Sequence, residues 1–286
     1  FYQSTYRRRP YYDWTWWADK SGHGEINLER AIYQSCNTYF YELADLLGID
    51  RVEEYLATVG FGRNNSIDIP EAGVGILASR AWKLENRGEP WYLGETPFEG
   101  IGNGITQTTT LQMASAVAAI ANHGKLMHPR LLKGLIDKEG QFHPAVFDRT
   151  DDYSTLLATE EHIAFVRNAM VQVVNKPYDP EIRRHEGSAY PHIGNQASTS
   201  YIMGGKTGTA QVIEFSVTAG QREDRELPDD LNHHAMFIAF DASPESKIAI
   251  AVYVEHGGSG GAVAAPIAQA VMDAYIQSAS QLAAAD

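Results

Sequence analysis

Apolar residues recur at helical spacing in the first part of the chain. Residues 28–34 and 39–47 carry hydrophobic side chains three or four positions apart, which predicts helices, and the intervening residues 35–37 are expected inside the same helical stretch. Asp50 is expected to cap a further helix over 52–59. This part of the chain is therefore predicted to be almost entirely helical.

The rest of the chain alternates between periodic segments and polar loops. Further helices are predicted over 111–121, 160–173 and 264–276, and strands within 129–148, 206–213, 235–240 and 248–254. Loops are predicted over 60–108, 176–200 and 214–232, the last of them acidic and mobile. Because helices gather in the middle and hairpins come late, the fold class is expected to be α+β with an antiparallel sheet.

Composition limits the classes of function. A chain of 286 residues with 44% hydrophobic and 21% charged residues is ordinary for one large globular domain. A net charge of −13 argues against nucleic acid as a partner. The basic run 7–9 fits a contact with anionic headgroups or glycan phosphates, but a solvated segment is the favoured interpretation. A single Cys excludes an internal disulfide, and no apolar run is long enough to span a membrane.

Two short motifs carry groups suited to acyl transfer. Lys206, Thr207, Gly208 and Thr209 place an ammonium, two hydroxyls and an unobstructed backbone on one strand, which are the groups needed to hold a carboxylate and a reacting carbonyl. The run Ser35-Cys36-Asn37 lies 171 residues before Lys206 and offers a hydroxyl and an amide. Each motif alone is also compatible with a strand entry or with a polar break in a helix.

Together the two motifs resemble two of the three active-site motifs of penicillin-recognising serine acyltransferases. The Gly-rich stretch 100–114, followed by Ala121-Asn122-His123-Gly124, resembles class B penicillin-binding proteins. The pair Trp91-Tyr92 and the Trp-rich start resemble the elongation type, penicillin-binding protein 2, most closely. The resemblance covers nearly the whole chain. It implies a penicillin-binding transpeptidase fold, shared with β-lactamases, with an antiparallel five-stranded sheet flanked by helices.

The resemblance also implies an activity and a setting. Members of the family are D,D-transpeptidases that cross-link peptidoglycan stem peptides through a serine acyl-enzyme, and β-lactams inhibit them. Ser35, Asn37 and Lys206 would be catalytic, with Ser35 as proton shuttle, and Thr207, Gly208 and Thr209 would bind substrate. No cofactor is required for this chemistry. A membrane glycosyltransferase and an elongation scaffold protein are the implied partners, at the periplasmic face of the bacterial inner membrane.

One family motif is missing from the sequence. No Ser is followed three positions later by Lys, whereas the family nucleophile is the Ser of Ser-x-x-Lys. We therefore expect residues 1–286 to be a partial transpeptidase domain without its nucleophile-bearing segment and inactive by itself. Two alternatives stay open: a β-lactamase of the same superfamily, which would show many turnovers, and a non-catalytic sensor or scaffold domain that binds the ligand.

A separate group of residues near the start has the donor types of a zinc site. Asp13, Asp19, His23 and Cys36 lie within 24 residues and combine carboxylate, imidazole and thiolate ligands. A structural zinc there would pin the aromatic N-terminal segment to the helix carrying Asn37. The spacing is not that of a standard zinc motif, and the alternative is an inert buried Cys with a His on the surface.

Overall fold

Helices form most of the regular structure of this protein. The computed structural model describes residues 1–6, 10–146, 153–180, 184–194, 200–211, 232–244 and 248–285. The helices are α1 (Trp14–Asp19), α2 (Leu28–Tyr33), α3 (Asn37–Leu47), α4 (Ile49–Thr58), α5 (Arg80–Arg87), η1 (Leu93–Glu95), α6 (Thr96–Gly100), α7 (Thr110–Ala121), α8 (Glu160–Asn175), α9 (Tyr190–Ile193), η4 (Gly260–Ala264) and α10 (Ala265–Ala285). The strands are β1 (Lys125–Met127), β2 (Gly134–Ile136), β3 (Phe142–Pro144), β4 (Tyr153–Thr155), β5 (Tyr178–Asp179), β6 (Arg184–His185), β7 (Met203–Ala210), β8 (His234–Asp241) and β9 (Ala249–Val254).

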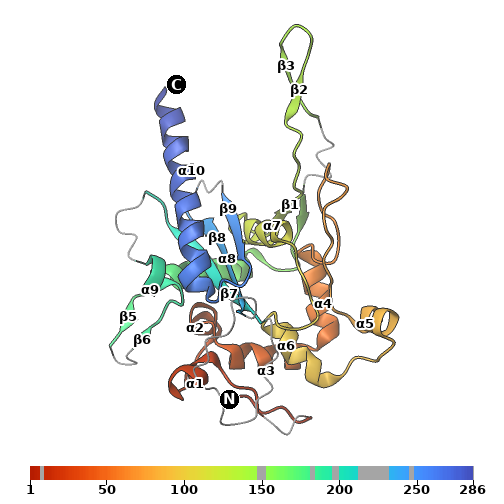
Figure 1. The fold of residues 1–286 in the computed structure, drawn as a ribbon, viewed down its shortest axis with the longest axis vertical. Helices are drawn as coiled ribbons and strands as arrows, with labels where there is room; N and C mark the ends of the chain where they lie inside the picture. The colour runs from red at the N-terminus through yellow and green to blue at the C-terminus, as the bar shows by residue number, and fades with distance from the viewer. Residues whose placement is uncertain are drawn as a thin grey trace.

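The main sheet is antiparallel and has the order β7-β8-β9 in the described part of the chain. Its register places Lys206 opposite Ile238 and Thr209 opposite Ala235. Helices pack against both of its faces (Figure 1). The expected α+β class is therefore confirmed, although the described residues supply three strands to this sheet where five were expected.

Strand β8 runs through the middle of the core, and its side chains alternate between the two faces. Phe237 packs with residues of α9, η4 and α10 on one face, whereas Ile238 and Phe240 pack with α2, α7 and α8 on the other. Such double-sided burial is the largest source of stability available to a domain of this size, because apolar area leaves water on both faces at once.

Two glycines bring β7 close to this core. A Cβ at Gly204 would lie 2.5 Å from the ring of Phe240, and one at Gly205 would lie 2.6 Å from the ring of Phe237. Real Cβ atoms do not approach neighbours so closely, so these aromatic rings occupy the space that side chains on β7 would need. The strand carrying Lys206 is thus held directly against the best-packed part of the molecule.

Several sequence predictions are corrected in detail. Helix α4 begins at Ile49 after Gly48, so Asp50 lies in its first turn and is not the cap. Helix α10 continues to Ala285, nine residues beyond its expected end at Ile276. The loop predicted over 176–200 contains β5, β6 and α9.

The predicted hairpin within 129–148 is confirmed, with Gly134 opposite Pro144. It projects from the body of the protein, as does the end of α10 (Figure 1). None of the helices in the described ranges is long and apolar enough to cross a bilayer. The basic run 7–9 and most of the acidic segment 214–232 lie outside the described residues.

Candidate active site

Ser35 interrupts the helical stretch in which it was expected. It lies between α2 and α3 with φ of 56°, in the left-handed region that a non-glycine residue rarely adopts. Backbone hydrogen bonds from Ser35 to Ile32 (3.2 Å) and from Cys36 to Ala31 (2.9 Å) close the turn. The break turns the Ser35 side chain out of the helix surface and toward β7.

The side chains of Ser35 and Lys206 contact each other between the α2–α3 turn and β7. The ammonium Nζ of Lys206 donates to Ser35 Oγ at 2.7 Å and to the carbonyl of Thr207 at 2.8 Å. Burial lowers the pKa of Lys206 to about 8, because removing water disfavours the charged form. We call this pair the Ser–Lys junction. It brings together two motifs separated by 171 residues.

The other predicted site residues lie around the junction. Asn37 is the first residue of α3, and its half-buried side chain makes no hydrogen bond within the described part of the chain. Thr209 is exposed on β7, whereas Thr207 and Gly208 are half-buried. An amide and a hydroxyl are thus open to a ligand on either side of the junction.

Sequence reasoning missed three residues that contact these motifs or the residues flanking them. Asn103, in the Gly-rich loop after α6, accepts from the backbone N–H of Gln211 at 3.3 Å, just beyond β7. Ser188 Oγ lies 3.1 Å from Thr207 Oγ1, and Glu186 Oε1 accepts a hydrogen bond from the side-chain amide of Gln34 at 3.4 Å. Both Glu186 and Ser188 fall in the segment that was predicted to be a polar loop, where no periodicity or motif spacing distinguishes them.

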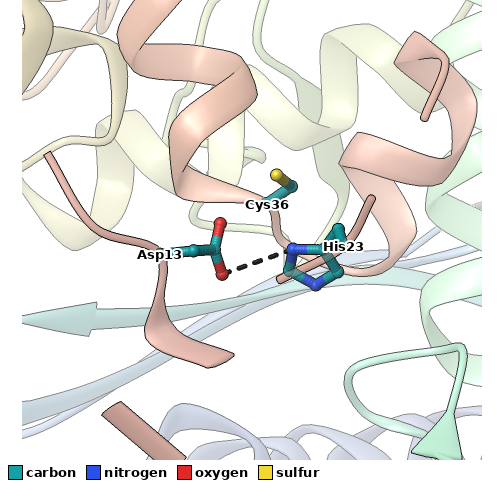
Figure 2. Close-up of side chains that lie close together, drawn as sticks. All are labelled: Asp13, His23 and Cys36. Carbon is teal, nitrogen blue, oxygen red and sulfur yellow. Dashed lines mark ion pairs between the residues drawn. The ribbon is translucent and has the colours of Figure 1, made fainter. Parts of the chain in front are cut away.

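A second group of side chains lies next to the junction. Asp13 caps α1, His23 lies between α1 and α2, and Cys36 immediately precedes α3. Their potential ligand atoms all lie within 4.8 Å of one another (Figure 2). We call these three residues the N-terminal cluster. Asp19 does not belong to it, since its carboxylate is exposed and accepts from the N–H of Ser21 at 2.9 Å.

The N-terminal cluster is buried and its imidazole lacks hydrogen-bond partners. The side chain of His23 is only 2% exposed, which overturns the alternative of a surface His. His23 Nδ1 lies 3.3 Å from Asp13 Oδ1, yet within the described part of the chain neither ring nitrogen has a partner with hydrogen-bonding geometry. Leaving such groups unpaired is costly, so the three side chains have the character of a ligand set.

Of the two acidic groups in the N-terminal cluster, Asp13 ionises far more readily than Cys36. Burial opposes its ionisation, but the neighbouring His23, the N–H of Thr38 and the thiol of Cys36 together lower the pKa of Asp13 to about 2. Burial, followed by the negative charge of Asp13, raises the pKa of the Cys36 thiol to about 11. A carboxylate, an imidazole and a thiol at these positions fit a zinc ion, which would hold the sulfur as thiolate.

Comparison with known protein families identifies the family to which this chain belongs. Residues 2–273 match the family "Penicillin binding protein transpeptidase domain". The chain belongs to this family. Membership accounts for the meeting of Ser-x-Asn with Lys-Thr-Gly, and it confirms the fold and the family expected from the motifs.

Individual transpeptidases of the family match over most of this chain. The peptidoglycan D,D-transpeptidase MrdA of Salmonella typhimurium is 34% identical over 93% of the chain, and the chain covers 40% of that relative. The crystal structure of Pseudomonas aeruginosa PBP2 in complex with WCK 5153 matches with a TM-score of 0.74 and 34% identity, covering 96% of this chain and 54% of that one.

A complex between PBP2 and MreC from Helicobacter pylori matches with a TM-score of 0.65 and 27% identity, covering 89% of this chain and 41% of that one. The chain thus spans less than half the length of the curated relative and of this penicillin-binding protein. It contains the Ser-x-Asn and Lys-Thr-Gly motifs.

Proposed function

We propose that this chain provides the substrate-binding and proton-shuttling part of an elongation-type D,D-transpeptidase. The observation that carries the proposal is the 2.7 Å contact between Lys206 Nζ and Ser35 Oγ. It joins the two motifs in the geometry that acyl transfer through a serine requires. Residues 1–286 contain no Ser-x-x-Lys, so the proposal does not assign the nucleophile to them.

Each side chain of the site has a role in this reaction. Ser35 passes a proton to the leaving amine nitrogen, and Lys206 orients its hydroxyl while attracting the anionic substrate. Thr207 and Thr209 hold the terminal carboxylate, and the side-chain amide of Asn37 holds the peptide bond before the scissile one. Gly208 leaves room for the substrate backbone beside β7.

The proposed substrate is the D-Ala–D-Ala end of a peptidoglycan stem peptide, with β-lactams as inhibitors that acylate the nucleophilic serine of the family rather than Ser35. The family membership and the 34% identity to MrdA support this assignment. We place the reaction at the periplasmic face of the bacterial inner membrane. A membrane glycosyltransferase and a scaffold protein are the proposed partners, the latter supported by the PBP2–MreC complex.

Intact mass spectrometry of the full-length protein with a penicillin tests the proposal. A single stable adduct, strongly reduced in Lys206→Ala, is the expected result. Rapid loss of the adduct with many turnovers would instead indicate a β-lactamase. A protein that binds the penicillin without gaining mass would indicate a sensor or scaffold, and either outcome overturns the transpeptidase assignment.

We further propose that Asp13, His23 and Cys36 hold a structural zinc ion, with water as fourth ligand. The unpartnered buried imidazole and the adjacent thiol support this assignment. The ion would supply no chemistry to acyl transfer. It would tie the N-terminal segment to the first turn of α3, where Thr38 N–H already donates to Asp13 at 3.2 Å.

Metal analysis of the protein purified without added zinc tests this site. About one zinc per chain is expected, with loss in Cys36→Ser and in His23→Ala and retention in His143→Ala, whose ring is exposed on β3. Asp19→Asn should keep the metal, because the carboxylate of Asp19 lies outside the cluster. Wild-type protein without metal would overturn the assignment.

A further inference from the structure

The segment from Glu186 to Ser188 lies between the two motifs of the Ser–Lys junction, although it belongs to neither. On one side it contacts Tyr33 and Gln34, the two residues before Ser35. On the other it contacts Thr207, the residue after Lys206. A single short segment therefore reaches both halves of the site.

Glu186 is a buried acid at the centre of this arrangement, with 7% of its surface exposed. Its Oε1 lies 3.4 Å from a guanidinium nitrogen of Arg30 on α2, and its Oε2 lies 3.7 Å from Lys176 Nζ at the end of α8. The same Oε1 accepts from the Gln34 side chain at 3.4 Å. Two cations compensate the charge of this buried carboxylate, and moving Gln34 would cost it a hydrogen bond where little water can replace the donor.

Ser188 completes the connection. Its backbone N–H donates to the carbonyl of Tyr33 at 2.9 Å, and its Oγ lies 3.1 Å from Thr207 Oγ1. The first contact fixes the end of α2 and the second fixes the side chain of Thr207. The hydroxyl pair also orients the group that the proposed function assigns to the substrate carboxylate.

The segment itself has little freedom to move. A Cβ at Gly187 would lie 2.5 Å from the carbonyl oxygen of Gln172 and 2.7 Å from that of Val173. Ala189 donates to the carbonyl of Val173 at 3.0 Å. Since these partners are backbone atoms of α8, the segment is seated directly on that helix and cannot shift without moving it.

We propose that Glu186 and Ser188 are positioning residues that set the approach of Ser35 to Lys206. The inference rests on the proposed function, because it assigns them to acyl transfer. Ser35 has a φ of 56°, a strained conformation that persists only where several surrounding contacts hold it in place. The contacts of Glu186 with Gln34 and of Ser188 with Tyr33 hold the residues just before Ser35. The contact of Ser188 with Thr207 connects them to β7.

Stopped-flow acylation of the full-length protein by a penicillin tests the inference. Such kinetics separate the dissociation constant of the non-covalent complex from the acylation rate constant. In Glu186→Gln and Ser188→Ala we expect the rate constant to fall roughly 10- to 100-fold, because small displacements of reacting groups are costly. We expect the dissociation constant for Glu186→Gln to stay within about twofold, because Glu186 does not touch the ligand.

Two further variants separate positioning from folding. Ser188→Thr keeps the hydroxyl and should restore acylation to near the wild-type rate constant, which a purely structural defect would not allow. Glu161→Gln removes an exposed carboxylate from the first turn of α8 and should change neither constant. If Glu186→Gln does not fold, the Ser188→Ala and Ser188→Thr pair carries the test.

The outcomes distinguish this inference from the proposed function. Wild-type protein that is never acylated overturns the proposed function and the positioning role with it. Normal acylation of wild type, with unchanged rate constants in folded Glu186→Gln and Ser188→Ala, overturns only the positioning role. Variants that merely lower the melting temperature, while the folded fraction acylates at the wild-type rate, also overturn it.

Discussion

The Ser–Lys junction and the N-terminal cluster are neighbours in the chain but are built in opposite ways. Ser35 and Cys36 are adjacent residues, one in each site. Lys206 comes from a strand held against the core by Phe237 and Phe240. His23 comes from the segment between two short helices, α1 and α2, and its ring nitrogens have no hydrogen-bond partner among the described residues.

The difference shows two solutions to holding polar groups in place. The junction is rigid because β7 belongs to a sheet packed on both faces, so its geometry is present before a ligand binds. The N-terminal cluster gathers three potential ligand atoms from three segments, and the proposed ion would satisfy them. Changes at the junction should therefore alter activity, and changes at the cluster should alter stability.

Lys206→Ala should have the largest effect and separates the two regions most clearly. We expect acylation of the full-length protein to fall roughly 100- to 10,000-fold, because the proton shuttle Ser35 loses the group that orients its hydroxyl and the substrate loses the cation that attracts it. The melting temperature should change little, because a buried cation is removed together with its desolvation cost. Fluorescent-penicillin labelling and thermal unfolding measure the two quantities. A large fall in melting temperature would contradict the comparison.

Removing the metal from the N-terminal cluster should have the reverse effect. If the ion is present at about 100 times its dissociation constant, chelation or Cys36→Ser should cost about 2.7 kcal/mol of stability. Thermal unfolding with and without chelator measures this, and limited proteolysis should show earlier cleavage before residue 28. The acylation rate of the folded fraction should fall much less than in Lys206→Ala. Equal losses of rate would show that the two regions are not separable.

Gly205→Ala tests whether the junction depends on core packing. The new Cβ would lie 2.6 Å from Phe237 and 2.7 Å from the carbonyl oxygen of Ile238. We expect a loss of about 1–3 kcal/mol from overpacking, together with weaker acylation, because β7 must move. Gly94→Ala is a matched control, since a Cβ there meets nothing within 4 Å. Chemical denaturation measures both variants, and equal stabilities would refute the packing argument.

The pH dependence gives a smaller effect and sharpens the role of Lys206. Its pKa is lowered from 10.5 to about 8, so the cation is present below that pH and lost above it. Acylation by an anionic penicillin should fall by up to about tenfold per pH unit above pH 8.

Stability should move in the other direction. Between pH 8 and 10.5 the unfolded chain binds more protons at this lysine than the folded chain does, so this group makes folding more favourable as pH rises. Lys206→Arg stays charged and should flatten the alkaline limb. Parallel pH profiles for the wild type and Lys206→Arg would exclude Lys206 as the titrating group.

The sequence predicted those features that depend on local pattern or on a motif. Hydrophobic spacing located α3, α7 and α8, and motif resemblance assigned Lys206 and Ser35 to one active site. The break at Ser35 was missed, because helical periodicity continues on both sides of it and the left-handed turn is imposed by tertiary contacts such as Ser188 to Tyr33.

Contacts made by isolated polar residues were not predictable. Glu186 and Ser188 act through Gln34 and Thr207, which are distant in sequence, and nothing in the segment 176–200 distinguishes them from solvated loop residues. Asp19 shows the opposite error, because it has a suitable ligand type near His23 yet faces solvent. Residue type and proximity in sequence do not determine where a side chain points.

The glycine pair at the start of β7 also limits how this protein can evolve. A side chain at Gly204 or Gly205 would collide with an aromatic ring, so single substitutions there should impair folding before they could alter ligand binding. Positions with free space, such as the exposed Thr209, should tolerate substitution more readily. If β-lactams inhibit the protein as proposed, the tight packing of one strand restricts the positions at which resistance could arise.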